Sequence, residues 1–196
     1  MSIAILIPSG NTWDSAFARC VVNLVGQLAH NDIQHTTYNI EGSILPQSRQ
    51  KLLDLACEHD YALCLDADML FPMDIVPKMM IHEKPIIVSN YVTRMPCSFV
   101  CHGMEGGRMD SRGKTGIERA SRVALGCALI DMSYIKSLPK PWFNFKWLDD
   151  KQDFCGEDYY FSDLCTSNSV EMWVDHDLSQ EVAHVKTINL YPNMVL

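Results

Sequence analysis

Two aspartates stand one residue apart where an apolar segment ends. Asp66 and Asp68 follow YALCL, whose side chains are apolar on both expected faces, and the apolar triplet MLF comes next. Two carboxylates held this close repel each other, and one tends to take up a proton unless a cation lies near both. A divalent metal ion with oxygen ligands provides that cation and also binds phosphate oxygens. The pair therefore indicates a metal and phosphate site; the alternative is that both side chains only cap a turn and the helix after it.

A second acidic pair, Glu157 and Asp158, opens a predicted helix directly after Gly156. The helix dipole favours acidic side chains in a first turn, so a purely structural role is one interpretation. The aromatic residues that follow at once are expected to pack on the core and hold both carboxylates firmly, which favours a chemical role. His184 is a lone histidine among apolar neighbours, and most such histidines are core residues rather than ligands.

The segment between residues 94 and 122 is rich in basic side chains, namely Arg94, Arg108, Arg112, Lys114, Arg119 and Arg122. They indicate either a local basic surface or a solvated polar loop. Cys97, Cys101 and His102 lie in the same segment and suggest a zinc-stabilised module that binds nucleic acid. That interpretation lacks a second pair of ligands at a matching spacing.

The elements that would position these residues alternate along the first half of the chain. Strands are expected at residues 3–8, 35–40, 61–66 and 85–92, with helices at about 14–30, 46–59 and 74–82. The third strand is apolar on both faces, which is typical of a central parallel strand. This order predicts an α/β sheet built from right-handed crossovers, with Asp66 and Asp68 at the edge where ligands bind.

The second half predicts different elements. We expect a long mobile Gly-rich loop at residues 103–120, one strand at 121–132, an extended aromatic segment at 139–147, a helix at 156–168 and strands at 170–175 and 181–191. Gly126 suggests a bulge or a close backbone approach within its strand. Trp142 and Phe143 are interpreted either as a platform for a ligand or as core residues. Residues 1–196 are predicted to form one three-layer domain.

Bulk composition narrows the class of protein. The 196 residues are 47% hydrophobic, which is enough for a core without disulfides or a structural metal. The first apolar run is too short for a signal sequence or a membrane span, and the cysteines are scattered, so we expect a reduced, cytoplasmic protein. A net charge of −8 argues against nonspecific binding to nucleic acid or an anionic membrane.

Three segments carry a family resemblance. YALCLDADMLFP, RVALGCALID and GEDYYFSDLCTSNSVEMWVDHDLSQEVAHVK resemble, in this order, motifs of nucleotide-sugar-dependent glycosyltransferases with the GT-A fold. The similarity is greatest to small single-domain members, related to family 2, from phages and large viruses. It implies a three-layer, Rossmann-like fold with a mixed, mostly parallel sheet. It also implies a hexosyl- or pentosyltransferase that moves a sugar from a nucleoside diphosphate to an acceptor hydroxyl, in the host cytoplasm if the protein is viral.

The resemblance further implies roles at the metal site and the reacting centre. Asp66 and Asp68 match the Asp-x-Asp motif, whose second aspartate binds Mn²⁺ or Mg²⁺ and whose first contacts the ribose or a metal-bound water. His184 matches the histidine that completes the metal coordination. Asp158, with Glu157 beside it, matches the acidic pair from which inverting enzymes draw their general base.

Binding of the nucleotide is implied for three other residues. Pro8 and Ser9 match the turn that lies against the nucleoside. Arg49 matches an arginine near the nucleotide, although Gln50 stands where many relatives have asparagine. The acceptor stays open between a modified DNA base, a capsid protein and a glycan. The donor sugar, its base and the oligomeric state also stay open.

An alternative enzyme class is a metal-dependent nucleotidyl or phosphoryl transferase, which would also use clustered carboxylates on an α/β sheet. Against it, the chain has no Gly-x-x-x-x-Gly-Lys loop, and PSGNTWD after the first strand has neither several glycines nor a lysine. The glycosyltransferase interpretation is therefore preferred.

Overall fold

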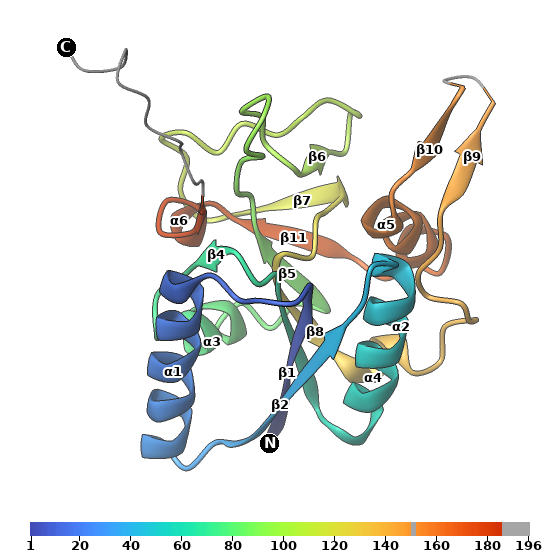
Figure 1. The fold of residues 1–196 in the computed structure, drawn as a ribbon. Coiled ribbons are helices and arrows are strands. Elements are labelled where there is room, and N and C mark those ends of the chain that lie inside the picture. The colour runs from blue at the N-terminus through green and yellow to red at the C-terminus, as the bar shows by residue number, and fades with distance from the viewer. Residues whose placement is uncertain (150–151, 186–196) are drawn as a thin grey trace, which may run out of the picture.

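The computed structural model describes residues 1–149 and 152–185. Its centre is an eight-stranded sheet in the order β2-β1-β3-β8-β5-β11-β7-β6 (Figure 1). The strands are β1 (Ser2–Ser9), β2 (Gln34–Glu41), β3 (Tyr61–Leu65), β5 (Ile86–Ser89), β6 (His102–Gly103), β7 (Ile117–Arg122), β8 (Cys127–Asp131) and β11 (Met172–Asp175). Only β7 and β8 run opposite to the others. The predicted mixed, mostly parallel α/β sheet is confirmed.

Helices flank this sheet, with α1 on one side of β1 and α2 on the other (Figure 1). The helices are α1 (Ser15–His30), α2 (Leu45–Leu55, followed by a 3₁₀ turn at Ala56–Glu58), α3 (Ile75–Met80), α4 (Met132–Ile135), α5 (Glu157–Ser167) and α6 (His176–Ser179). Side chains on both faces of β1 and β3 are buried because helices cover the sheet from both sides. One contiguous hydrophobic core results.

Helix α1 shows how the local sequence sets an element. The Asp14 carboxylate accepts a hydrogen bond from the Ala16 backbone N–H at 2.8 Å and caps the helix start. Phe17, Val21, Leu24 and Leu28 form the buried stripe at helical spacing. The predicted helix at 14–30 is therefore confirmed nearly to the residue.

The prediction of one strand at residues 121–132 is wrong. The segment is divided between β7 and β8, and residues 123–126 belong to neither strand. Side chains of α5 take the backbone hydrogen bonds there: Ser162 Oγ accepts from Val123 N at 3.1 Å, and Asp158 Oδ2 accepts from Leu125 N at 3.2 Å. A backbone bonded to helix side chains cannot also bond to a neighbouring strand.

Among the described residues, two short strand pairs lie outside the main sheet. β4 (Met69–Leu70) pairs with β12 (Ala183–His184), and β9 (Lys146–Leu148) pairs with β10 (Asp153–Cys155). β12 is all that the described residues contain of the strand predicted at 181–191, and residues 186–191 lie outside them. The segment at 139–147 was expected to be extended, but its pairing into a hairpin was not predicted.

Several other predictions have a clear outcome. Trp142 and Phe143 are core residues, and Phe143 stacks on Phe161 with ring centroids 5.0 Å apart. The irregular segment predicted at 103–120 ends early, because β7 begins at Ile117. None of the eight cysteines, all of them within the described residues, forms a disulfide, and most are buried, as expected of small apolar side chains. In the part of the chain that the structure describes, none of the helices combines the length and apolar character needed to cross a bilayer.

Candidate active site

A cleft of about 620 Å³ opens at the carboxyl edge of the sheet. Pro8, Ser9, Asp66, Asp68 and His184 line it together with other residues. The strands β1 and β3 are parallel neighbours, so the residues at their ends meet at one edge. β12 lies antiparallel to β4 and thereby brings a residue distant in sequence to the same place. Five of the predicted site residues thus share one cleft.

The turn after β1 is fixed by two residues that the sequence analysis did not identify. Asn39 Oδ1 accepts hydrogen bonds from Ser9 Oγ at 2.9 Å and from Trp13 Nε1 at 3.0 Å. Trp13 lines the cleft and packs edge-on against Phe17 with ring centroids 5.4 Å apart. An aromatic residue four positions after a strand that ends in Pro-Ser was a signal available in the sequence. Asn39 offered no such signal, because only the β1–β2 register brings it here.

Asp68 and His184 face each other with atoms that both carry lone pairs. Asp68 Oδ1 lies 3.3 Å from His184 Nε2, and His184 Nδ1 lies 3.2 Å from the Val92 carbonyl oxygen. A carbonyl only accepts, so Nδ1 carries the proton in a neutral imidazole and Nε2 does not. Burial, aided by the charge of Arg94, lowers the pKa of His184 and favours that neutral form. A cation between the two atoms would satisfy both, as in many metal sites.

Asp66, the third predicted metal ligand, contacts Arg49 rather than Asp68 or His184. Asp66 Oδ1 accepts a hydrogen bond from Arg49 Nη2 at 2.9 Å. Across residues 1–149 and 152–185, no three His, Cys, Asp or Glu side chains converge closely enough to hold one ion. The remaining oxygen of Asp68 forms an ion pair with Arg94. The pair Asp68–His184 therefore fits two ligands of a metal that also binds phosphate and water, and the role of Asp66 stays a prediction.

Arg49 lies behind the cleft, at the centre of three carboxylates. Its side chain is 4% exposed and lies 2.9 Å from Asp66, 3.2 Å from Glu157 and 3.5 Å from Asp158. Burial alone would lower the pKa of this guanidinium, but the charges of Asp158, Asp66 and Glu157 outweigh it and raise the pKa. The geometry makes Arg49 an ion-pair centre, and direct contact with the nucleotide stays a prediction.

Asp158 combines a fixed position with an unusual proton affinity. Its Oδ2 accepts from Leu125 N at 3.2 Å, whereas the buried Oδ1 has no hydrogen-bond partner among the described residues. Burial, reinforced by the nearby charges of Glu157 and Asp66 and opposed by Arg49, raises the pKa of Asp158 to about 7. A carboxylate that can take up a proton near neutral pH is suited to general-base chemistry.

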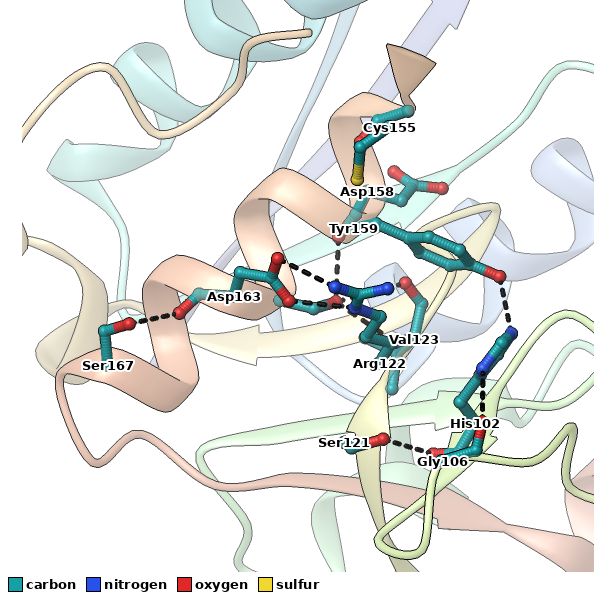
Figure 2. Close-up of polar contacts among 12 residues, drawn as sticks. His102, Gly106, Ser121, Arg122, Val123, Cys155, Asp158, Tyr159, Asp163 and Ser167 are labelled. Atoms are coloured by element: carbon teal, nitrogen blue, oxygen red, sulfur yellow. Dashed lines mark hydrogen bonds and ion pairs between the residues drawn. The ribbon is translucent and has the colours of Figure 1, made fainter. Parts of the chain in front are cut away.

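The helix that carries this acid is fastened to the strands beside it, as Figure 2 shows. Arg122, at the end of β7, forms a two-pronged ion pair with Asp163 at 2.9 Å for each contact. The Tyr159 hydroxyl lies 2.9 Å from His102 Nε2, and Arg122 lies over the Tyr159 ring, 5.3 Å from its centroid. These contacts hold the first turns of α5, and therefore Asp158, in place.

Gly126 allows the side chains of Tyr91 and Asp66 to approach the backbone closely. A Cβ at this position would lie 2.4 Å from the Tyr91 hydroxyl oxygen and 2.7 Å from Asp66 Oδ2. The Gly126 carbonyl also accepts from Asp66 N at 3.0 Å. The expected close backbone approach is therefore present. Any side chain here must displace Tyr91, Asp66 or the backbone.

Gly126→Ala is accordingly expected to destabilise the protein by roughly 1–3 kcal/mol, as overpacking does in a close-packed site. Urea unfolding measures this loss. Gly107→Ala is the matched control, because its added methyl group meets no atom within 4 Å. Equal stability of Gly126→Ala and the control would show that the close approach at residue 126 is not a constraint.

The basic residues predicted as a possible surface are mostly neutralised. Arg94, Arg112, Lys114, Arg119 and Arg122 form ion pairs with Asp68, Asp110, Glu118, Glu171 and Asp163 respectively. Arg108 donates instead to the Phe99 carbonyl. Within the described residues this segment therefore presents paired charges, and the choice between the two interpretations stays a prediction.

The zinc interpretation finds no site in the described part of the chain. Cys97 is exposed, Cys101 is fully buried, and His102 contacts Tyr159. Burial raises the pKa of the Cys101 thiol to about 12, which disfavours the thiolate that zinc binds. No cluster of zinc ligands forms around these three residues in the described segments.

Comparison with known proteins agrees on the fold. No protein-family model matches the sequence, and the curated proteins give no match. Among solved structures, the chain is similar to A197 from STIV, with 17% identity and a TM-score of 0.58 over 89% of this chain and 81% of that one. It is also similar to GalNAc-T7 with UDP, GalNAc and Mn²⁺, with 12% identity and a TM-score of 0.62 over 95% of this chain and 44% of that one.

A third similar structure is a mutant of Drosophila β-1,4-galactosyltransferase 7 in complex with manganese, UDP-Gal and xylobiose. The identity is 11% and the TM-score 0.54, over 95% of this chain and 71% of that one. The TM-scores establish a shared fold. Because the sequence identities are this low, the activity has to be argued from the site. The chain therefore has the GT-A fold, which the motifs in its sequence predicted.

Proposed function

We propose that the protein transfers a sugar from a nucleoside-diphosphate sugar to an acceptor hydroxyl, with inversion at the anomeric carbon. The observation that carries this proposal is the pair of facing acceptor atoms, Asp68 Oδ1 and His184 Nε2, 3.3 Å apart in the cleft at the carboxyl edge of the sheet. Such a pair suits a divalent cation, and a cation beside a cleft at this edge suits a diphosphate.

Asp68 and His184 would hold Mn²⁺ or Mg²⁺, with Asp66 close by, and the imidazole favours Mn²⁺. When bound, the ion neutralises the charge that develops on the leaving diphosphate. Pro8 and Ser9 are proposed to contact the nucleoside, and Trp13, which lines the same cleft, offers a ring for its base. Arg49 positions Asp66 and Asp158 from behind.

Asp158 is proposed as the general base, with Glu157 as the alternative. The acceptor oxygen forms a bond to the anomeric carbon, and the bond from that carbon to the diphosphate oxygen breaks. The nucleoside diphosphate leaves with the electron pair, and the proton of the acceptor hydroxyl passes to Asp158. Its raised pKa, about 7, suits both uptake and release of this proton near neutral pH. A single displacement of this kind inverts the anomeric configuration.

The proposal also covers the class of donor sugar and the cell compartment of the protein. UDP-sugars are the first donors to test, because two of the similar structures contain UDP or UDP-Gal together with manganese. A reduced, cytoplasmic protein is proposed because none of the eight cysteines, all within the described residues, forms a disulfide. The whole of residues 1–196 is proposed to act as one domain.

Thermal melting with UDP-, GDP-, CDP- and TDP-sugars, with and without Mn²⁺, tests the donor class. A ligand at 100 times its Kd adds about 2.7 kcal/mol to the free energy of unfolding. For a chain of this size the expected rise in Tm is about 5–10 °C. One nucleotide series should give this shift only with Mn²⁺, and Asp68→Ala should abolish it.

Asp54→Ala is the control for that experiment, because it removes an exposed carboxylate on α2 outside the cleft. It should keep the full donor-induced shift. No shift with any donor and any metal would contradict the proposal and favour a nucleotidyl or phosphoryl transferase.

A further inference from the structure

An exposed group of aromatic side chains stands on one face of the β9–β10 hairpin. Phe145, Trp147 and Phe154 are 48%, 45% and 63% exposed. Trp147 lies directly opposite Phe154 in the strand register, and Phe145 is two residues before Trp147, so the three share a face. The ring centroids of Trp147 and Phe154 are 5.0 Å apart, and those of Phe145 and Phe154 are 6.5 Å apart.

This aromatic hairpin face, defined as Phe145, Trp147 and Phe154, is not required by the main core. None of the three belongs to the contiguous core or its packed margin in the part of the chain that the structure describes. Figure 1 shows the hairpin extending from the body beside α5. Three large aromatic rings grouped on a protruding ribbon expose apolar area that a globular fold normally buries, which is typical of a binding surface.

Both ends of the hairpin are firmly anchored. On the β9 side, Trp142 and Phe143 are buried, and the Trp142 backbone N–H donates to Gln50 Oε1 at 2.8 Å. On the β10 side, Cys155 is buried, and Gly156 caps the start of α5. Phe154 is four residues before Asp158 in the chain, and the buried Cys155 and the helix cap Gly156 lie between them. The hairpin therefore leads directly into the first turn of α5, which carries the proposed base.

The charged side chains near the aromatic hairpin face indicate whether a nucleic acid or an uncharged ligand fits it better. Polyanion-binding sites combine stacking rings with a positively charged groove. Here Lys146 is accompanied by Asp149 and Asp153, and the whole chain carries a charge of −8. The basic residues of the segment from 94 to 122 are largely paired with carboxylates, as Arg122 is with Asp163. Nothing in these contacts favours a nucleic acid over an uncharged ligand.

We infer that the aromatic hairpin face binds the sugar rings of an uncharged carbohydrate acceptor. The inference rests on the proposed function and names its acceptor class. The C–H faces of a pyranose ring pack on aromatic rings, while its hydroxyl groups stay free for solvent, polar side chains and reaction. Because β10 runs directly into the α5 turn that carries Asp158, a carbohydrate on this face is inferred to extend a hydroxyl towards the base.

Saturation-transfer NMR on the full chain tests this inference. The probes are xylobiose, cellobiose, lactose, chitobiose and mannobiose, together with oligo(dT) and anionic phosphatidylserine vesicles. At least one disaccharide should bind, and Trp147→Ala and Phe154→Ala should each weaken that binding by about fivefold to tenfold. Tyr134→Ala is the matched control, because Tyr134 is 47% exposed on α4, outside the hairpin, and this variant should bind as wild type does.

Three outcomes would overturn the inference: no disaccharide binds, the hairpin variants bind disaccharides as wild type does, or oligo(dT) or vesicles bind through the hairpin instead. The donor-induced melting shift is measured on the same samples. A normal donor shift without hairpin-dependent sugar binding contradicts only the acceptor class. If no donor raises the Tm of the wild-type protein, the proposed function itself is contradicted.

Discussion

Asp158→Asn is expected to lower the rate of sugar transfer by about 10²–10⁴-fold, the usual contribution of a positioned general base. The amide keeps an oxygen that can accept from Leu125 N, but it cannot take up the proton of the acceptor hydroxyl. The wild-type rate should rise with pH as Asp158 loses its own proton, around its pKa of about 7, and a bound metal ion should lower that midpoint. A pH profile of the initial rate measures both effects.

Glu157→Gln is the matched control for the choice of base. It changes the neighbouring carboxylate, which also lies beside Arg49 at 3.2 Å. If Glu157→Gln abolishes activity while Asp158→Asn leaves it nearly unchanged, the two roles are reversed. In either variant the donor-induced melting shift should persist, since neither side chain lines the cleft.

Asp158→Asn is also expected to change how the stability of the protein depends on pH, and the sign of this change follows from the raised pKa of Asp158. The Asp158 carboxyl has a raised pKa in the folded state, so between about 4 and 7 the native protein binds more protons than the unfolded chain. The free energy of unfolding therefore falls as pH rises through that window, and Asp158 contributes to this fall. Asp158→Asn should flatten it, which urea unfolding at pH 5 and pH 8 would reveal.

Arg49→Met is expected to destabilise the protein by about 3–5 kcal/mol, the effect of removing one partner from a buried ion-pair group. Three carboxylates, those of Asp66, Glu157 and Asp158, would lose their common cation. Repulsion among them would then open the junction between β3 and α5. For a chain of this size the Tm should fall by about 6–20 °C.

Arg19→Met is the control, because Arg19 is an exposed arginine on α1. Its effect on stability should stay within about 0.5 kcal/mol. Arg49→Lys should recover only part of the loss, since a single ammonium group cannot reproduce the planar fork that reaches several carboxylates. A stability of Arg49→Met close to wild type would show that the carboxylates do not need this cation.

The sequence by itself was sufficient for the type and order of most elements. Period-2 and period-3.6 patterns are local, so α1, β1 and β3 could be located from neighbouring residues alone. The prediction at residues 121–132 failed because its backbone N–H groups bond to Ser162 and Asp158, which lie more than thirty residues later. No local pattern contains that information.

Some features of the candidate site could likewise be predicted from the sequence, and others could not. The pairs Asp66/Asp68 and Glu157/Asp158 were visible because their members lie within two residues of each other, at the end of a recognisable strand and the start of a recognisable helix. The position of Arg49 among three carboxylates was not visible, since it requires α2, β3 and α5 to meet. Burial then raises the pKa of Asp158, and burial is a property of the packed chain.

The aromatic residues show most clearly what the sequence alone could not decide, namely which side chains are buried and which are exposed. From the sequence, Trp142 and Phe143 were interpreted either as a platform for a ligand or as core residues. The tertiary structure buries Trp142 and Phe143 under α2 and α5, while the β9–β10 pairing leaves Phe145, Trp147 and Phe154 exposed. The sequence alone determined the elements and the candidate chemistry, because these depend on residue type and short-range spacing. Only the tertiary structure decided which side chains meet, which are buried and which remain free to bind, because those properties depend on contacts between distant segments.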